Sequence, residues 1–257
     1  MSAVYQLSSC IEWQFAEAGE LDARLRAAKA AGFELAEFHL WRDKPIEALA
    51  DALGQTGMRL TSLCVDPRRS IVNPTEREAM LAAVGDAIAA TRVLGAPDLI
   101  IASGFRVEGL SEEEHFANAV TTLRAAADLA EAAGVTLLLE PLNTRLFAAM
   151  YLVSTKLGLD LVEVVGSPNL RLLYDVWHSA VMGDDMAEVL AGRVHLVAHV
   201  HVADMPDRNE PGTGDLDWAQ VTKTLRDLGY TGAIGLEYFP TLPMDESLAL
   251  SQRMLAD

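Results

Sequence analysis

The sequence alternates along its whole length between Ala/Leu-rich stretches with helical periodicity and short apolar runs. Many of the helical stretches end near a glycine, which adopts the left-handed conformation of a helix C-terminus without strain. The runs are apolar on both faces, which is typical of buried parallel strands. The strands that we expect are Val4–Leu7 and residues 33–38, 58–64, 99–102, 135–139, 170–173, 194–202 and 233–236.

Eight strand–helix units in 257 residues, with no linker or change of composition, predict one α/β domain. We expect a single (β/α)₈ TIM barrel over residues 1–257. The apolar faces of two of its helices are marked by Leu21, Leu25 and Ala28 and by Leu123, Ala127 and Ala130. An open, doubly wound sheet of eight strands is the alternative, but no G-x-G-x-x-G motif follows the first strand.

Charge and composition exclude several classes of function. With 20 Lys and Arg against 37 Asp and Glu, the net charge is −17, which disfavours nucleic acid as a partner. No apolar run approaches the roughly 20 residues of a membrane span. The start of the chain has no basic segment typical of a secretory signal, and Cys10 and Cys64 are too few for a disulfide framework. We therefore expect a cytoplasmic protein with a small-molecule substrate and no membrane partner; a homo-oligomer stays open.

Polar residues stand where the predicted strands end, and barrel enzymes place their chemistry at those ends. These residues are Glu37, Asp66, Glu140, Asp175, His201 and Glu237. A carboxylate at the end of a buried strand costs several kcal/mol unless something pairs with it. Because the last four would converge at one mouth, we expect a divalent metal between Glu140, Asp175, His201 and Glu237. Three carboxylates and an imidazole without thiolates suit Mn²⁺ or Mg²⁺, although Co²⁺ or Zn²⁺ could substitute.

Two further residues follow these strands in mouth-side loops. His178 and Arg208 could hold substrate oxygens, since an arginine fork suits a carboxylate. The alternative for both residues is a loop salt bridge with Asp204, Asp207 or Glu210.

We expect the other histidines to lie outside the set of metal ligands. His39 borders the site, and His115 is a solvated helix residue. His195 and His199 alternate with His201 and should lie deeper in the barrel as packing or supporting residues. Residues 211–214 (PGTG) form a tight turn that leads to Asp217 as a helix cap, because the nearby acids would repel a phosphate.

At these residues the sequence resembles the hydroxypyruvate isomerase family of the xylose-isomerase-like sugar isomerase/epimerase barrels. The matching stretches are residues 140–145 (EPLNTR), 174–178 (YDVWH), 199–204 (HVHVAD) and 208–214 (RNEPGTG), together with Glu237-Tyr238. The resemblance implies that Glu140, Asp175, His201 and Glu237 hold the metal. It also implies that Glu140 and Glu237 move the proton and that His178 and Arg208 bind substrate.

Three departures from the family concern the substrate more than the chemistry. Hydroxypyruvate isomerases usually have glutamine where this chain has His201, whereas keto-sugar epimerases have histidine. Residues 146–150 do not resemble the family's loop, and Trp177 and Ser179 replace its usual tyrosine and glutamine.

The predicted chemistry is proton removal next to a carbonyl, through an enediolate, with two glutamates as acid and base. Return of the proton to the neighbouring carbon gives an aldose–ketose type isomerisation, such as hydroxypyruvate to tartronate semialdehyde, which is the first choice. Return to the same carbon from the opposite face, by the second glutamate, gives a keto-sugar 3-epimerase. Expulsion of a leaving group from a 3-keto sugar gives a lyase or dehydratase. A non-catalytic barrel and an apurinic-site nuclease are disfavoured, by the intact ligand set and by the acidic charge respectively.

Overall fold

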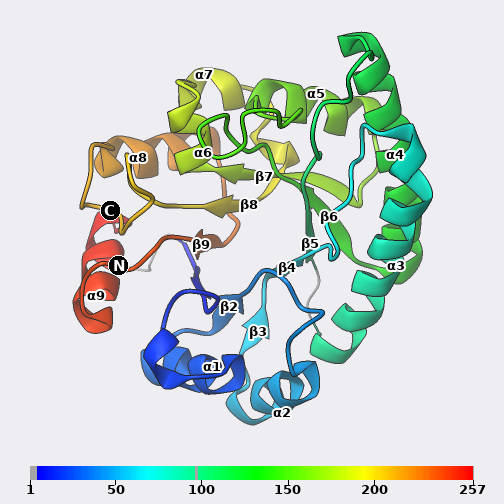
Figure 1. Ribbon diagram of the computed structural model, residues 1–257. Helices are drawn as coiled ribbons and strands as arrows, with labels where there is room; N and C mark the ends of the chain where they lie inside the picture. The colour runs from blue at the N-terminus through cyan, green and yellow to red at the C-terminus, as the bar shows by residue number, and fades with distance from the viewer. Residues whose placement is uncertain (1–4, 96–97, 257) are drawn as a thin grey trace.

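The computed structural model describes residues 5–95 and 98–256. Within them, parallel strands form a nearly closed barrel with helices around it (Figure 1). The strands are β1 Leu7–Cys10, β2 Leu35–Glu37, β3 Arg59–Leu60, β4 Ser62–Cys64, β5 Asp98–Ile101, β6 Thr136–Leu139, β7 Leu170–Asp175, β8 Val197–His201 and β9 Ile234–Leu236. The α-helices are α1 Leu21–Ala30, α2 Ile46–Thr56, α3 Arg77–Leu94, α4 Glu112–Ala133, α5 Thr155–Val165, α6 Val176–Val181, α7 Met186–Leu190, α8 Trp218–Leu228 and α9 Met244–Met254. The 3₁₀ helices are η1 Ala16–Ala18, η2 Pro74–Glu76 and η3 Val194–Leu196.

The third predicted strand, residues 58–64, is divided into β3 and β4. The two parts pair with the strands on either side, which brings the ends of the sheet together. The sheet order is β3-β2-β1-β9-β8-β7-β6-β5-β4, with β3 paired to β2 and β4 paired to β5. Only Thr61 separates β3 from β4, and its N–H donates to the Ala36 carbonyl at 2.8 Å. The eight predicted strands therefore correspond to the nine described segments, and the TIM barrel is confirmed.

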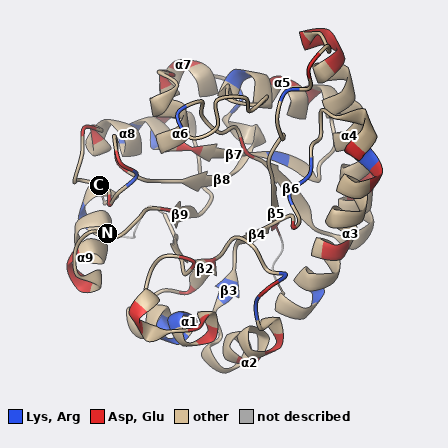
Figure 2. Ribbon diagram, in the orientation of Figure 1, with Lys and Arg blue, Asp and Glu red and all other residues tan. Residues whose placement is uncertain are grey.

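The helices pack on the barrel as their apolar stripes predict. Leu21, Leu25 and Ala28 of α1 are buried, as are Leu123, Ala127 and Ala130 of α4. Glycines close five of the helices in the left-handed conformation: Gly57, Gly95, Gly134, Gly166 and Gly229. Figure 2 shows acidic residues on the surrounding helices, among them α1 and α9. Among the described helices, none combines the length and hydropathy needed to span a bilayer.

The first strand lies later than predicted. The sequence predicts Val4–Leu7, whereas β1 is Leu7–Cys10; Val4 is outside the described residues. Ser8 and Ser9 fit into buried β1 because both hydroxyls are hydrogen-bonded. The two hydroxyls of Ser8 and Thr61 are hydrogen-bonded at 2.9 Å, and Ser9 donates to Gln14 Oε1 at 2.6 Å.

The seventh strand is shorter than the predicted residues 194–202. For this reason the expectation that His195 lies deep in the barrel is wrong. Val194–Leu196 form η3, so β8 begins only at Val197. His195 is therefore exposed rather than deep in the barrel. His199, by contrast, is buried in β8 as expected.

The expectation that His115 is solvated is also wrong. Its side chain is buried because the loop before α4 folds back over it. The ring accepts the N–H of Val107 at 2.9 Å and stacks on Tyr151 with ring centroids 5.3 Å apart. Helical periodicity could not reveal this cover, because it comes from loops outside the helix.

Asp204 organises the long loop between β8 and α8. Its Oδ2 accepts the N–H of Gly212 at 2.7 Å and the indole N–H of Trp218 at 2.8 Å, while Oδ1 accepts the N–H of Leu216 at 3.1 Å. Asp217 caps α8 through the N–H of Gln220, as predicted. The PGTG segment is thus a turn fixed by a buried carboxylate.

Replacing Asp204 with asparagine is expected to lower the free energy of unfolding by about 1–3 kcal/mol. The amide would present an N–H to a donor and leave a buried group unsatisfied. Urea denaturation measures the change. Asp207→Asn is the control, since Asp207 is exposed in the same loop. Equal stability of the two variants would contradict the role given to Asp204.

Candidate metal centre

Four side chains converge where β6, β7, β8 and β9 end. Asp175 and His201 are the last residues of β7 and β8, and Glu140 and Glu237 directly follow β6 and β9. One nitrogen or oxygen atom from each lies within 4.8 Å of the others, and all four residues are buried. The structure therefore brings together the complete set that the strand ends predict.

Several atoms of this cluster lack the hydrogen bonds that buried polar groups need. His201 Nδ1 lies 3.1 Å from Glu237 Oε2 and 3.7 Å from Glu140 Oε1. Within residues 5–95 and 98–256, neither His201 Nδ1 nor Glu140 Oε1 has a hydrogen-bond partner of normal geometry. Such orphaned buried atoms call for a ligand or ion, because desolvation without compensation is costly.

Asp175 is oriented by the helix that follows it. Its Oδ1 accepts the N–H groups of Trp177 at 2.8 Å and His178 at 3.0 Å, so Asp175 is the N-cap of α6. This leaves Oδ2 toward the cluster, where Arg208 lies 3.3 Å away and His178 Nε2 lies 3.7 Å away. Asp175 Oδ1 thus caps the helix, while Oδ2 faces the cluster.

Arg208 does not form the loop salt bridge considered from the sequence. Its guanidinium pairs with Asp175 and Glu237 and lies over two indole rings, 5.3 Å from the Trp13 centroid and 5.0 Å from Trp177. Its backbone has a φ of 65°, a left-handed conformation that costs a non-glycine residue about 1–3 kcal/mol. Arg208 Nε has no hydrogen-bond partner among the described residues, so it is an available buried donor.

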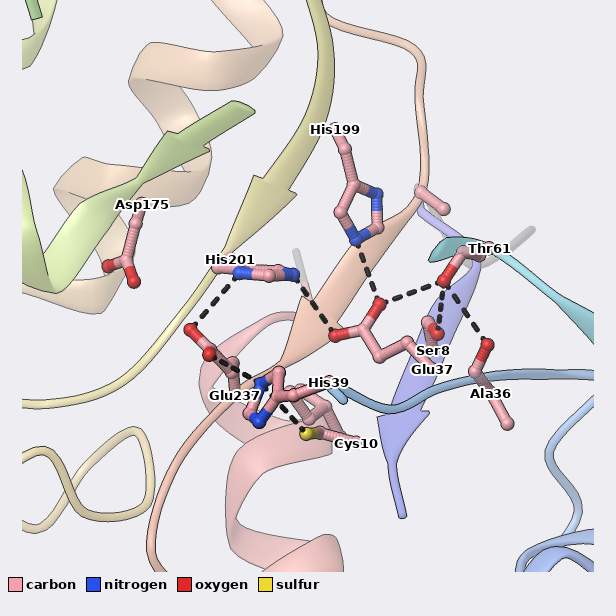
Figure 3. Close-up of polar contacts among 12 residues, drawn as sticks. Ser8, Cys10, Ala36, Glu37, His39, Thr61, Asp175, His199, His201 and Glu237 are labelled. Carbon is pink, nitrogen blue, oxygen red and sulfur yellow. Dashed lines mark hydrogen bonds and ion pairs between the residues drawn. The ribbon is translucent and has the colours of Figure 1, made fainter. Parts of the chain in front are cut away.

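A second buried cluster, formed by Glu37, His199 and His201, shares His201 with the first. Glu37 at the end of β2 contacts His201 Nε2 at 3.2 Å and His199 Nε2 at 2.9 Å, and it accepts the Thr61 hydroxyl at 2.8 Å (Figure 3). Nε2 of the His201 ring therefore faces Glu37, while Nδ1 faces Glu237. Gly235 provides the space, since a Cβ there would collide with Glu37 Oε1.

The pKa values of the cluster are strongly perturbed. Burial alone would lower the pKa of His201, but Glu237 and Glu37 raise it well above its usual range. Burial opposes ionisation of Glu237, yet Arg208 and His201 hold its pKa well below normal. Burial raises the pKa of Asp175, against the opposite effect of His178 and Arg208. Perturbed carboxylates and an imidazole in one buried cluster are typical of functional sites.

A cavity of about 130 Å³ opens beside the cluster. Its lining includes Glu140, Glu237, His178 and Arg208, which places the predicted catalytic and substrate-binding residues around one space. His39 also lines it, as expected, and its Nε2 is 2.8 Å from Glu237 Oε1.

The sequence did not reveal one site residue, Trp13, and did not place the strand-end residues Glu37 and Asp66 relative to the cluster. Trp13 covers Arg208, but nothing in its sequence context after the first strand singles it out. Glu37 is a strand-end residue whose contact with His201 the strand count did not predict. Asp66, also a strand end, lies apart and accepts the backbone N–H of Arg42.

The barrel carries at its mouth a buried cluster of carboxylates and an imidazole that could hold a metal ion. Residues 25–256 match the xylose isomerase-like TIM barrel family. The chain therefore belongs to that family, which confirms the resemblance stated above.

The relatives narrow this class further. The chain is 30% identical over 239 residues to the hydroxypyruvate isomerase of Escherichia coli, covering 90% of this chain and 93% of the relative. It is 29% identical over 224 residues to the 2-oxo-tetronate isomerase of Cupriavidus necator, covering 84% and 86%. A solved structure described as AP endonuclease, family 2, from Brucella melitensis superposes with a TM-score of 0.87 at 28% identity, covering 95% and 97% of the two chains. The relatives named as isomerases support an enzymatic role for this chain.

Proposed function

We propose that the chain is a divalent-metal-dependent isomerase of a small α-hydroxy-carbonyl acid or sugar, similar to hydroxypyruvate isomerase. The observation that carries the proposal is the buried group of Glu140, Asp175, His201 and Glu237, with atoms within 4.8 Å of one another. Relatives named as hydroxypyruvate and 2-oxo-tetronate isomerases support the substrate class.

The four residues fit a divalent cation. Three carboxylates and one imidazole without a thiolate suit Mn²⁺ or Mg²⁺, with Co²⁺ and Zn²⁺ as alternatives. The orphaned atoms of Glu140 and His201 are the ligand atoms that such an ion would satisfy. When bound, the cation would polarise the substrate carbonyl and stabilise negative charge on its oxygen.

Glu140 and Glu237 move the proton in this proposal. They follow β6 and β9, which are separated in the sheet by β7 and β8, so the two carboxylates can flank a planar enediolate. One carboxylate oxygen removes the proton from the carbon that carries the hydroxyl. The proton then returns to the neighbouring carbon, while the hydroxyl proton passes to the oxygen of the former carbonyl, which completes the isomerisation.

His178 and Arg208 bind the substrate in this proposal. His178 Nδ1 and Arg208 Nε are buried and have no hydrogen-bond partner in the part of the chain that the structure describes, so each offers a polar atom to a substrate oxygen. The indoles of Trp13 and Trp177 against the guanidinium restrict its motion and exclude water from one side.

Replacing Arg208 with alanine is expected to raise KM for hydroxypyruvate at least about tenfold, because a charge-assisted hydrogen bond to the carboxylate is lost. Steady-state kinetics measure this, with Arg26→Ala on the exposed face of α1 as the control. Arg208→Lys should recover only part of the loss, since lysine cannot form the fork. An unchanged KM for the acid, with a preference for a neutral sugar, would refute the role of Arg208.

A keto-sugar 3-epimerase is the second candidate, and the observation that favours it is a histidine at position 201. A lyase or dehydratase would use the same residues on a 3-keto sugar. Proton NMR in D₂O separates them: deuterium at C3 of D-fructose indicates the epimerase, and release of an aglycone or water from a 3-keto glucoside indicates the lyase.

The proposal also covers the domain, the cellular location and the partners of the protein. Residues 1–257 form one domain, and the enzyme works in the cytoplasm on a small molecule without nucleic acid or membrane. A homo-oligomer is compatible with it.

A further inference from the structure

A second and larger cavity lies beside the metal centre. Its volume is about 450 Å³, within the range of roughly 300–1,000 Å³ in which small-molecule sites fall. The two cavities share five lining residues: Val65, Arg68, Ala102, Leu142 and Phe147. The two cavities therefore adjoin each other, which places the second one next to the space beside the metal centre.

The walls of the second cavity are mainly apolar. Met80 of α3, Ile101 at the end of β5 and Met150 contribute buried side chains. The loop after β5 is fixed by the Ser103 hydroxyl, which accepts the N–H of Leu152 at 2.9 Å. This space is thus built by the fold at the same mouth as the metal centre.

The charge of the lining contrasts with that of the chain. Arg68, Arg69 and Arg106 line the cavity in a protein of net charge −17. The one lining carboxylate, Glu76, already accepts the N–H of Ser70 and the amide of Asn73.

Two of these three arginines are free for a ligand. Arg106 pairs with Glu112 and lies 5.4 Å over the Tyr151 ring. Across residues 5–95 and 98–256, no carboxylate lies within ion-pair distance of Arg68 or Arg69. Guanidinium groups without a carboxylate partner, beside an apolar wall, are suited to an anionic group.

We infer that the second cavity binds the far end of the substrate, and that this end carries an anion. The substrates then include, besides hydroxypyruvate, longer α-hydroxy-carbonyl compounds with a phosphate ester or a second carboxylate held by Arg68 and Arg69. This inference rests on the proposed function for the position of the reacting end.

Binding to the Mg²⁺-loaded full-length protein tests the inference without turnover. Isothermal titration calorimetry compares D-gluconate with 6-phospho-D-gluconate and D-glucarate, which share an α-hydroxy acid end but lack the ketone needed for isomerisation. We expect a terminal anion to tighten binding at least about tenfold, the size of one charge-assisted hydrogen bond. Tighter binding of the phosphate ester alone, or of the diacid alone, identifies which anion the cavity takes. Equal affinities of all three acids would overturn the inference.

Variants locate the effect. Arg69→Ala and Arg69→Gln should each reduce the preference for the terminal anion at least about fivefold, while Arg92→Ala on the exposed face of α3 should leave it unchanged. Arg69 is exposed, so these variants should fold, which circular dichroism verifies. A preference that persists in both Arg69 variants and in Arg68→Ala would also overturn the inference.

Failure of the inference can be told from failure of the proposed function. If the phosphorylated acid binds tightly but hydroxypyruvate exchanges no protons in D₂O, the subsite stands and the isomerase proposal is wrong. If hydroxypyruvate is turned over but no terminal anion improves binding, the isomerase stands and the subsite is wrong.

Discussion

Replacement of Glu237 with glutamine is expected to reduce kcat by about 10²–10⁴-fold or more, the usual contribution of a positioned acid or base. The substitution removes a proton acceptor and one of four proposed metal ligands at once. It also removes the carboxylate that pairs with Arg208 and lies 3.1 Å from His201. The amide keeps the shape of the side chain, so the loss reflects chemistry rather than packing.

The fold should survive this substitution. Arg208 retains Asp175 at 3.3 Å, and His201 retains Glu37 at 3.2 Å, so neither buried cation loses its last counter-charge. Circular dichroism and thermal melting verify the fold, and Glu246→Gln at an exposed position of α9 is the matched control. Turnover near that of the unmodified protein would refute the role of Glu237 in catalysis and metal binding.

Removal of divalent metal is expected to abolish turnover, and addition of Mn²⁺ or Mg²⁺ to restore it. A ligand that binds only the folded state at 100 times its Kd stabilises by about 2.7 kcal/mol. For a chain of this size the corresponding rise in Tm is roughly 5–10 °C. The protein should fold without metal, because Arg208 and His201 partly neutralise the carboxylates.

A pair of variants assigns this thermal shift to the four-residue cluster. Asp175→Asn should lose most of the rise in Tm, whereas Asp207→Asn, at an exposed loop position, should keep it. A protein whose Tm responds to none of Mn²⁺, Mg²⁺, Co²⁺ and Zn²⁺ would contradict the metal centre. The thermal shift requires no substrate, so it is independent of the reaction.

The barrel could be predicted because its repeat is local. Each helix has its own apolar stripe, and the helix ends at Gly134 and Gly229 need the left-handed conformation. The mouth also followed from the sequence, since parallel strands in a barrel end on one side. Glu140, Asp175, His201 and Glu237 could therefore be grouped before any contact was known.

The remaining features depend on contacts between distant segments. Ser8 and Thr61 are 53 positions apart, yet their hydrogen bond explains a polar residue inside β1. His115 is buried by a loop, and Arg208 takes partners from β7 and the end of β9 rather than from its own loop. Such pairings require the closed barrel, which hydrophobic periodicity does not describe.

The RNEPGTG loop shows how a family motif can be structural in part. Glu210 is buried and accepts the backbone N–H groups of Thr241 at 2.7 Å and Leu242 at 3.0 Å. It thereby attaches this loop to the segment that follows Glu237. Gly214 approaches the Met205 carbonyl so closely that a Cβ would collide with it. In this motif Arg208 serves the site while Glu210 and Gly214 maintain the loop.

The most direct test of the account is proton NMR of hydroxypyruvate in D₂O with the Mg²⁺-loaded protein. A parallel sample is incubated with Mn²⁺ and freed of the metal before acquisition. The account predicts exchange of the hydroxymethyl protons for deuterium together with formation of tartronate semialdehyde, both absent after chelation and in Glu237→Gln. Metal-loaded, folded protein that leaves the hydroxymethyl signal unchanged would contradict it.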